Sequence, residues 1–321
     1  MRAGWLEAQR LSFCPELDEP QPAGDEALIE VLLAGVCSTD LELLRGYYPY
    51  CGVPGHEFVG RVIASPADAS WVGRRVVGEI NLACGQCAAC RRGNPTHCEV
   101  RTVLGIVNRP GVFAERLCLP LRNLHLVPDE VADEAAVFCE PLAAAIEILE
   151  QVAIQPSQRV LVVGAGRLGQ LVAQTLSLTG CALQVVARHS RQRELLEARQ
   201  IAWIDEGQVP QRKLDVVVEA TGTPQGFHLA RQALRPRGTL VLKSTYHGDM
   251  TVNFSALVVD EITLVGSRCG PFAPALRLLA SEKVEPRPLV EARYPLEQVV
   301  RACEHAARPG ALKILIDPAL H

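Results

Sequence analysis

The sequence has no long apolar run and no surplus of positive charge. No stretch of about 18 apolar residues occurs, and the first twenty residues lack the apolar core of a signal peptide. We therefore expect no membrane association and predict a soluble protein of the cytoplasm. Lys and Arg number 32 against 36 Asp and Glu, a net charge of −4. Because no Lys/Arg-rich block stands out, the electrostatic basis for nucleic-acid binding is missing.

Internal repeats, low-complexity tracts and flexible linkers are also missing from the sequence. The chain has 321 residues, of which 48% are hydrophobic and 21% are charged. This composition is typical of a globular protein, and the length is sufficient for two domains, each with its own core.

Cysteine, in contrast, is abundant: the chain has twelve, and four fall in "CGQCAACRRGNPTHC" at 84–98. The cytoplasm keeps thiols reduced, so a disulfide framework is not expected. The spacing C-x2-C-x2-C-x7-C instead predicts a tetrahedral zinc site with the ligands Cys84, Cys87, Cys90 and Cys98. Four protein ligands leave no open position for a substrate, so we expect this zinc to be structural. The alternative is a set of buried cysteines without metal.

A second set of ligand-type residues lies upstream, in "AGVCSTD" (34–40) and "VPGHEFVG" (53–60). Cys37, His56 and Glu57 offer one sulfur, one imidazole nitrogen and one carboxylate. Three protein ligands with one open position are the catalytic arrangement for zinc. A cysteine and a histidine at this separation are more often ordinary core and surface residues, so the pair alone leaves both interpretations open.

The third motif is "VLVVGAGRLG" at 160–169, an apolar run followed by G-x-G-x-x-G and an apolar-patterned helix. This strand–turn–helix context is typical of a dinucleotide-binding unit. Gly164 permits the tight turn, Gly166 lets a pyrophosphate approach the backbone, and Gly169 lets helix and strand pack closely. A parallel βα unit with incidental glycines is the alternative. The expected cofactor-binding residues are Gly164, Gly166, Arg167, Leu168, Gly169, Arg188 and Thr221.

The order of strand and helix patterns predicts two different domains. Alternating β and α patterns over roughly 140–270 indicate a doubly wound parallel sheet, an α/β Rossmann domain. The N-terminal part has short β-like runs between Gly/Pro turns, which favours an antiparallel, β-barrel-like domain. We predict a catalytic domain over 1–139 with the zinc lobe at 84–98, a cofactor domain over 140–269, and a C-terminal return to the catalytic domain over 270–321.

Taken in order, "GVCSTD", "GHEFVG", the four-cysteine lobe, "FCEPLAAAIEIL" and "VLVVGAGRLG" resemble the zinc-dependent medium-chain alcohol dehydrogenase superfamily. The resemblance covers nearly the whole chain, and its "EPL" is similar to the polyol, threonine and glucose dehydrogenase branch. It implies a GroES-like β-barrel catalytic domain, a Rossmann cofactor domain, and homodimers or homotetramers built through the cofactor domains. It also implies hydride transfer between a secondary alcohol or polyol and a nicotinamide cofactor.

The same resemblance assigns roles to individual residues. The catalytic positions of the family fall on Cys37, Thr39, His56, Glu57 and Glu140. Cys37 and His56 are implied as the firm zinc ligands, whereas Glu57 is a ligand in some members. Glu140 is implied as a ligand, directly or through water. Thr39 matches a hydroxyl proton relay, and Asp40 is expected behind the ligands.

The second strand of the Rossmann unit bears on the choice of cofactor. In this fold an acidic residue about 20 positions beyond the glycines binds the ribose 2′-hydroxyl and repels a 2′-phosphate. Here that place reads "ARHSR", and Arg188 stands where the aspartate is expected. A guanidinium can hold the phosphate with paired, charge-assisted hydrogen bonds. We predict a preference for NADP(H) over NAD(H); the alternative is a solvated charge at a strand end.

Other functions stay open at this stage. A biosynthetic dehydrogenase for one large specialised alcohol, such as a pigment or antibiotic intermediate, fits the same motifs. A zinc-free quinone-reductase-like enzyme would lack the Cys37/His56 pair, and a zinc-ribbon binding module would lack the G-x-G-x-x-G domain. We expect two zinc ions per chain, one catalytic and one structural, and a small-molecule alcohol or ketone as the partner, with no nucleic acid and no membrane.

Overall fold

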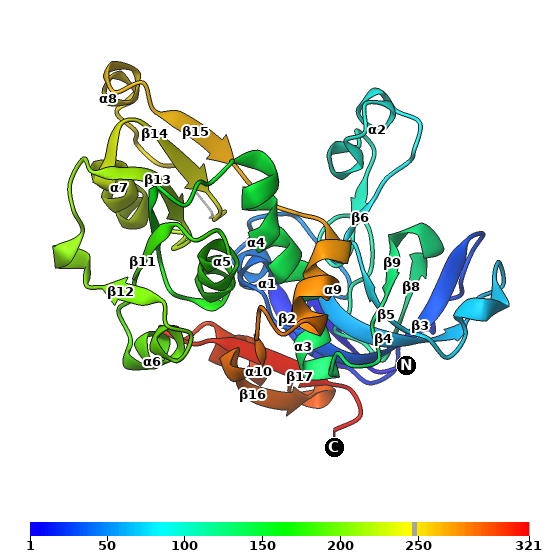
Figure 1. Cartoon of the computed structure of the whole chain (residues 1–321). Coiled ribbons are helices and arrows are strands. Elements are labelled where there is room, and N and C mark those ends of the chain that lie inside the picture. Colours follow the sequence, from blue (N-terminus) through cyan, green and yellow to red (C-terminus); the bar gives the residue numbers. More distant parts are fainter. Residues whose placement is uncertain (246–248, 321) are drawn as a thin grey trace. The chain divides into compact units, whose positions relative to one another are not determined.

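The computed structural model describes residues 1–245 and 249–320 and separates into two compact units (Figure 1). One unit comprises Met1–Glu140 together with Ala275–His321, and the other comprises Pro141–Pro274. The sequence analysis placed its boundaries after residues 139 and 269, and these domain bounds, with the catalytic and cofactor roles, stay predictions. In the described residues, no helix has the length and apolar character needed to cross a bilayer.

The first unit is built on a mainly antiparallel sheet. In spatial order its strands are β16 (Val290–Pro295), β17 (Lys313–Asp317), β3 (Glu26–Gly35), β4 (Glu57–Ala64), β5 (Arg75–Gly78) and β9 (Leu124–Leu126), with β8 (Arg116–Pro120) beside β3. A separate hairpin joins β1 (Ala3–Glu7) to β2 (Arg10–Cys14). Side chains from both faces of β3, such as Ile29 and Leu28, are buried, so this strand runs through the core of the unit.

The pairing of β3 with its two neighbours brings three distant segments to one end of the sheet. Gly35 pairs with Glu57 of β4, so the chain leaving β3 toward Cys37 starts beside the chain that enters β4 from His56. On the other side of β3, Leu315 of β17 lies opposite Gly35. The C-terminal strand therefore reaches the same end of the sheet as the predicted catalytic ligands.

The remaining elements of this unit are short. A lobe stands apart from the sheet in Figure 1 and contains β6 (Asn81–Leu82), α2 (Ala88–Arg91) and β7 (Thr102–Val103). The helices outside the lobe are α1 (Ser38–Leu44), α3 (Asp133–Ala136), α9 (Phe272–Ala280) and α10 (Val299–Ala306).

The second unit is a six-stranded parallel sheet with helical connections. In spatial order its strands are β12 (Ala202–Ile204), β11 (Ala182–Val186), β10 (Arg159–Val163), β13 (Leu214–Glu219), β14 (Leu234–Leu242) and β15 (Thr263–Gly266). The helices are α4 (Cys139–Gln151), α5 (Arg167–Ser177), α6 (Ser190–Ala198), α7 (Pro224–Ala233) and α8 (Phe254–Val259). From β10 the chain moves outward first through β11 and β12, then through β13, β14 and β15. This order confirms the predicted doubly wound sheet and places the reversal point between β10 and β13.

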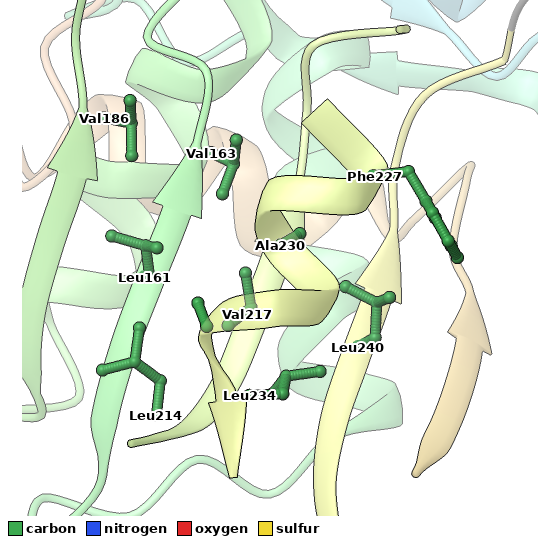
Figure 2. Close-up of a cluster of buried hydrophobic side chains, with 10 residues drawn as sticks. Leu161, Val163, Val186, Leu214, Val217, Phe227, Ala230, Leu234 and Leu240 are labelled. Atoms are coloured by element: carbon green, nitrogen blue, oxygen red, sulfur yellow. The ribbon is translucent and has the colours of Figure 1, made fainter. Parts of the chain in front are cut away.

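The core of the second unit lies between α7 and the central strands (Figure 2). Ala230 on α7 lies over Val217 of β13, and Leu161 of β10 and Leu240 of β14 flank this contact. Continuous burial of apolar residues is the usual pattern of parallel strands that are covered on both faces. The packing of α7 holds these strands in place, and the carboxyl ends of such a sheet are where a dinucleotide can bind.

Candidate metal centres and cofactor site

The first candidate centre lies where β3, β4 and α1 meet. Cys37 is the N-cap of α1, and His56 and Glu57 lie at the start of β4. The three residues each offer a ligand atom, and these atoms lie within 4.8 Å of one another. His56 and Glu57 are buried, whereas Cys37 is partly accessible. The register of the sheet therefore joins two motifs that are separate in the sequence.

Asp40 fixes the geometry of this centre from within α1. One carboxylate oxygen, Oδ2, accepts a hydrogen bond from the Cys37 backbone N–H at 2.8 Å, and the other, Oδ1, lies 3.1 Å from His56 Nδ1. The Asp40 side chain is only 2% exposed. A carboxylate behind a ligating imidazole fixes the ring orientation and leaves the other ring nitrogen available.

The electrostatic surroundings of His56 favour positive charge. Burial alone would lower the pKa of the imidazole, but the Asp40 carboxylate and the Cys37 thiolate outweigh it and hold the pKa well above its usual value. The buried His56 imidazole, with Asp40 and Cys37 beside it, therefore favours a cation, either a proton on the ring or a metal ion next to it. The donor set of sulfur, nitrogen and oxygen is the set that zinc binds.

Glu57 has two carboxylate oxygens in different situations. Its Oε2 accepts a hydrogen bond in a buried ion pair with Lys313 Nζ of β17. Its Oε1 is buried and has no hydrogen-bond partner among the described residues. A buried, unpartnered carboxylate oxygen is costly unless a cation binds it. The residues present therefore fit a zinc ion, with Oε1 as the free ligand atom.

Lys313 was not anticipated from the sequence. It is 2% exposed, its Nζ lies 3.5 Å from the carbonyl oxygen of Val36, and it stands 5.5 Å from the centre of the Phe138 ring. The ammonium group thus contacts the segment before Cys37 as well as Glu57. A lysine within "ALKILID" resembles an edge residue in the sequence, and its partner lies 256 positions away.

The other two predicted catalytic residues are Thr39 and Glu140. Thr39 Oγ1 is 3.8 Å from Cys37 Sγ, in the first turn of α1. Glu140 lies in the first turn of α4 and is partly exposed, and it is not in the group formed by Cys37 and its two partners. Cys139 beside it is fully buried, and burial raises the pKa of its thiol well above the usual value. A thiol in that setting stays protonated and is a weak ligand.

The second candidate centre is the four-cysteine lobe. Cys87 Sγ lies 3.5 Å from Cys90 Sγ and 3.8 Å from Cys98 Sγ, and all four sulfurs lie within 4.8 Å of one another. A tetrahedron with zinc–sulfur bonds of about 2.3 Å has sulfur–sulfur edges of about 3.8 Å. All twelve cysteines of the chain are free thiols, so the cluster fits four thiolate ligands around one zinc ion.

Backbone N–H groups in this lobe point to cysteine sulfur atoms and favour the ionised thiolate form. The Cys87 backbone N–H points to Cys84 Sγ at 3.3 Å, and the Cys84 backbone N–H points to Cys98 Sγ at 3.3 Å. Hydrogen bonds from the backbone of Cys90 and Glu99 lower the pKa of the Cys87 thiol to about 6. Burial raises the pKa of the Cys90 thiol to about 12. Such opposite shifts mean that a cation is needed before all four sulfurs can ionise together.

The G-x-G-x-x-G segment has the geometry that its sequence predicts. Gly164 has a φ of +106°, which only glycine adopts readily, and a Cβ on Gly169 would overlap the carbonyl oxygen of Gly164. Gly166 is the N-cap of α5, without a side-chain cap, and a Cβ there would meet nothing within 4 Å. Arg167 and Leu168 form the first turn. The open first turn presents backbone N–H groups to a phosphate.

Thr221 lies at the end of β13, beside the same edge of the sheet. Its backbone N–H donates to Glu219 Oε1 at 2.6 Å, and its hydroxyl lies 2.9 Å from the Thr223 hydroxyl. A Cβ on Gly164 would touch the Thr221 side chain. Thr221 is therefore packed against the glycine turn, and Glu219 holds it in place.

Arg188 follows β11 but is not a free cation. Its Nη2 donates to Glu206 Oε2 at 2.8 Å, and the side chains of the pair are 63% and 46% exposed. Arg193, one turn into α6, pairs with Asp205 and stacks on Trp203 at 4.3 Å from the ring centre. The sequence drew attention to Arg188 but not to Glu206, because Glu206 follows a different strand, β12.

Comparison with known proteins places the chain among dehydrogenases. Residues 23–129 match the family model described as the alcohol dehydrogenase GroES-like domain. D-arabinitol dehydrogenase 1 of Uromyces fabae is 30% identical over 99% of this chain and 97% of its own length. Sorbitol dehydrogenase of Halalkalibacterium halodurans is 29% identical over 94% of each chain.

Two solved structures share the whole architecture. A protein described as a zinc-binding dehydrogenase from Sinorhizobium meliloti 1021, bound to NADP, has a TM-score of 0.91 and 25% identity. An alcohol dehydrogenase from Escherichia coli CFT073, in complex with NADH, has a TM-score of 0.89 and 25% identity. Each comparison covers 99% of both chains. With a relative 30% identical along nearly its full length, and with the motifs in the same order, the chain belongs to the zinc-dependent medium-chain alcohol dehydrogenase superfamily.

Proposed function

We propose that this protein is a zinc-dependent oxidoreductase that transfers hydride between a secondary alcohol or polyol and a nicotinamide cofactor. The observation that carries the proposal is the group of Cys37, His56 and Glu57, with ligand atoms within 4.8 Å of one another and a buried Glu57 oxygen without a partner among the described residues. The D-arabinitol and sorbitol dehydrogenases among the relatives support a polyol-type substrate.

The residues divide the chemistry between them. Zinc held by Cys37, His56 and Glu57 would supply a Lewis acid that favours loss of a hydroxyl proton near neutral pH. The Thr39 hydroxyl would take up that proton and pass its own toward solvent. A bound nicotinamide would supply the acceptor for the hydride of the alcohol carbon. Asp40 would keep the imidazole of His56 in its binding orientation. Glu140 stays a candidate ligand, directly or through water.

The cofactor is proposed to be NADP(H) in preference to NAD(H). The first turn of α5 offers backbone N–H groups for the pyrophosphate, and Arg188 offers a guanidinium for a 2′-phosphate at the end of β11. The two related structures contain NADP in one case and NADH in the other. The preference must therefore come from residues of this chain, and Arg188 is the residue that supports it.

Three further proposals concern the zinc stoichiometry, the location in the cell and the oligomeric state. We expect two zinc ions per chain, because the cysteine lobe and the Cys37 centre each have a complete ligand set. The lobe would serve stability, since four thiolates leave no open position. Twelve free thiols are in keeping with a cytoplasmic location. The oligomer is proposed to be a homodimer or homotetramer.

The test combines metal analysis with turnover. Freshly purified protein is assayed on a panel of polyols, secondary alcohols and their ketones, and the nicotinamide absorbance is followed. We expect two zinc ions per chain and turnover of polyol-type substrates, and we expect a mild chelator to abolish turnover while the fold stays intact. Protein that holds two zinc ions but turns over no member of the panel with either cofactor would refute the function. One zinc ion or none in active protein would refute the two-centre proposal.

A further inference from the structure

Two oppositely charged side chains, Arg188 and Glu206, lie at the edge of the Rossmann sheet where a cation would have to bind the 2′-phosphate of NADP. Arg188 Nε and Nη2 both donate to Glu206 Oε2, at 3.1 and 2.8 Å. Arg188 follows β11 and Glu206 follows β12, and these strands are parallel neighbours. Both side chains therefore leave the same carboxyl edge of the sheet, which is the edge at which dinucleotides bind.

Glu206 changes what Arg188 can offer to a phosphate. A guanidinium has a fixed fork of donors, and here two of its N–H groups already point to one carboxylate oxygen. Because an exposed ion pair is weak, a 2′-phosphate can replace the carboxylate. The displaced carboxylate nevertheless stays close to the phosphate, and repulsion between like charges reduces the gain. With a 2′-hydroxyl in place of the phosphate, the pair can stay intact.

The neighbouring arginine is held in a different way. Arg193 Nε donates to the carbonyl oxygen of Ala187 at 3.0 Å, its guanidinium stacks on Trp203, and it forms an ion pair with Asp205. Its side chain is 28% exposed, against 63% for Arg188. These contacts fix Arg193 to the strand ends as a structural residue, whereas Arg188 and Glu206 are exposed enough to change partners.

We propose that Glu206 is a specificity-determining residue for the cofactor. It neutralises Arg188, limits the preference for NADP(H), and leaves NAD(H) usable in the same site. This inference rests on the proposed role of Arg188 toward the 2′-phosphate.

The test compares the wild-type protein with Glu206→Gln and with a matched control, Glu194→Gln. Glu194 is a comparably exposed acid that pairs with Arg191 within α6. Binding of adenosine 2′,5′-bisphosphate and of ADP is measured by calorimetry, and kcat/KM is measured with NADPH and NADH. We expect Glu206→Gln to raise the affinity ratio of bisphosphate to ADP by about two- to fivefold, the range that an exposed ion pair supplies. The control should leave the ratio unchanged.

A third variant separates this inference from the function on which it rests. Arg188→Gln should weaken binding of the bisphosphate more than binding of ADP. If Arg188→Gln binds the bisphosphate as well as the wild-type protein does, the proposed cofactor role of Arg188 is wrong. A different outcome is that Arg188→Gln binds the bisphosphate less tightly while Glu206→Gln leaves the affinity ratio of bisphosphate to ADP unchanged or lower. In that case only the role of Glu206 is wrong.

Discussion

Lys313 brings a positive charge into the core beside the first metal centre. Its ammonium group pairs with Glu57, and the two side chains are 2% and 1% exposed. Removal of one partner of a buried ion pair leaves the other charge uncompensated, which costs about 3–5 kcal/mol. In protein treated with a mild chelator to remove the zinc proposed at the Cys37 centre, Lys313 is the cation that pairs with Glu57, so we expect Lys313→Met to lower the free energy of unfolding by about 3–5 kcal/mol. Urea denaturation measures the loss, and Lys313→Arg should retain most of the stability.

The matched control removes both charges. In the same chelator-treated state, where Glu57 has no metal to bind, the double variant Glu57→Gln/Lys313→Met carries neither charge of the pair, so a large part of the lost stability should return. A Lys313→Met protein within about 1 kcal/mol of wild type would contradict the argument, because that is the effect of an exposed pair.

At the residue scale, sites whose residues are close in the sequence could be predicted, whereas contacts between residues far apart in the sequence could not. The four lobe cysteines are close in sequence, so their joint role could be read from one short segment. Glu57 could be named as a ligand candidate, but the ion pair that holds one of its oxygens could not. Glu206 was hidden in the same way, because its contact with Arg188 depends on how two strands lie next to each other.

At the element scale, Asp260 ties the end of α8 to two other segments. Its carboxylate accepts two hydrogen bonds from Arg212, at 2.7 and 2.8 Å, and one from Arg231 of α7. Hydrogen bonds from Arg212 and then Arg231 lower the pKa of Asp260 from 3.8 to about 2. A lowered pKa in the folded state means that the ionised carboxylate stabilises the fold above about pH 4, and that this stabilisation disappears as the pH falls toward 2.

We therefore expect Asp260→Asn to lower the melting temperature at neutral pH, and the difference from wild type to shrink as the pH falls from 4 to 2. Thermal unfolding over that pH range measures the difference. Glu261→Gln is the matched control, because the adjacent Glu261 is 72% exposed and pairs only loosely with Arg237 at 3.6 Å. A difference that stays constant down to pH 2 would show that Asp260 acts by packing and not by charge.

Strands that consist of apolar runs could be predicted from the sequence. Elements that are set by a helix cap or by pairing with a neighbouring strand were harder to predict. β14 begins at Leu234, four residues before the apolar run "GTLVL" at 238–242, and its pairing with β13 shifts register between Leu214 and Val216. The helix α7 was not predicted, although Thr223 caps it by accepting from the Gly226 backbone N–H at 3.1 Å and Pro224 opens its first turn. That Thr-Pro pair was a usable helix signal.

At the scale of the whole molecule, the order of motifs along the chain is sufficient to predict the fold class. The parallel sheet follows from simple rules, because an α-helix joins each strand to the next except between β12 and β13. The arrangement of β17 beside β3 follows from no local rule, since the two strands lie at opposite ends of the chain. The pattern of the tail after residue 270 predicted a return to the first domain, but it did not indicate that β17 pairs with β3.

The last prediction concerns assembly through the second unit. β15 is the final strand of the six-stranded sheet in the part of the chain that the structure describes, and Leu264 within it is 41% exposed. The preceding helix α8 exposes Phe254, Val258 and Val259 at 67%, 75% and 81%. A sheet edge beside several exposed apolar side chains is a suitable interface for a second copy of the chain.

We expect the double variant Val258→Glu/Val259→Glu to form smaller species than the wild-type protein. A glutamate in the interface would lose hydration without gaining a partner, so the dissociation constant should rise by at least about a hundredfold. Sedimentation velocity over a range of concentrations measures the mass of each protein. Val100→Glu is the control, since Val100 is also exposed, at 69%, but lies outside the second unit. A wild-type protein that is monomeric at every concentration, or a double variant with an unchanged mass, would exclude this interface.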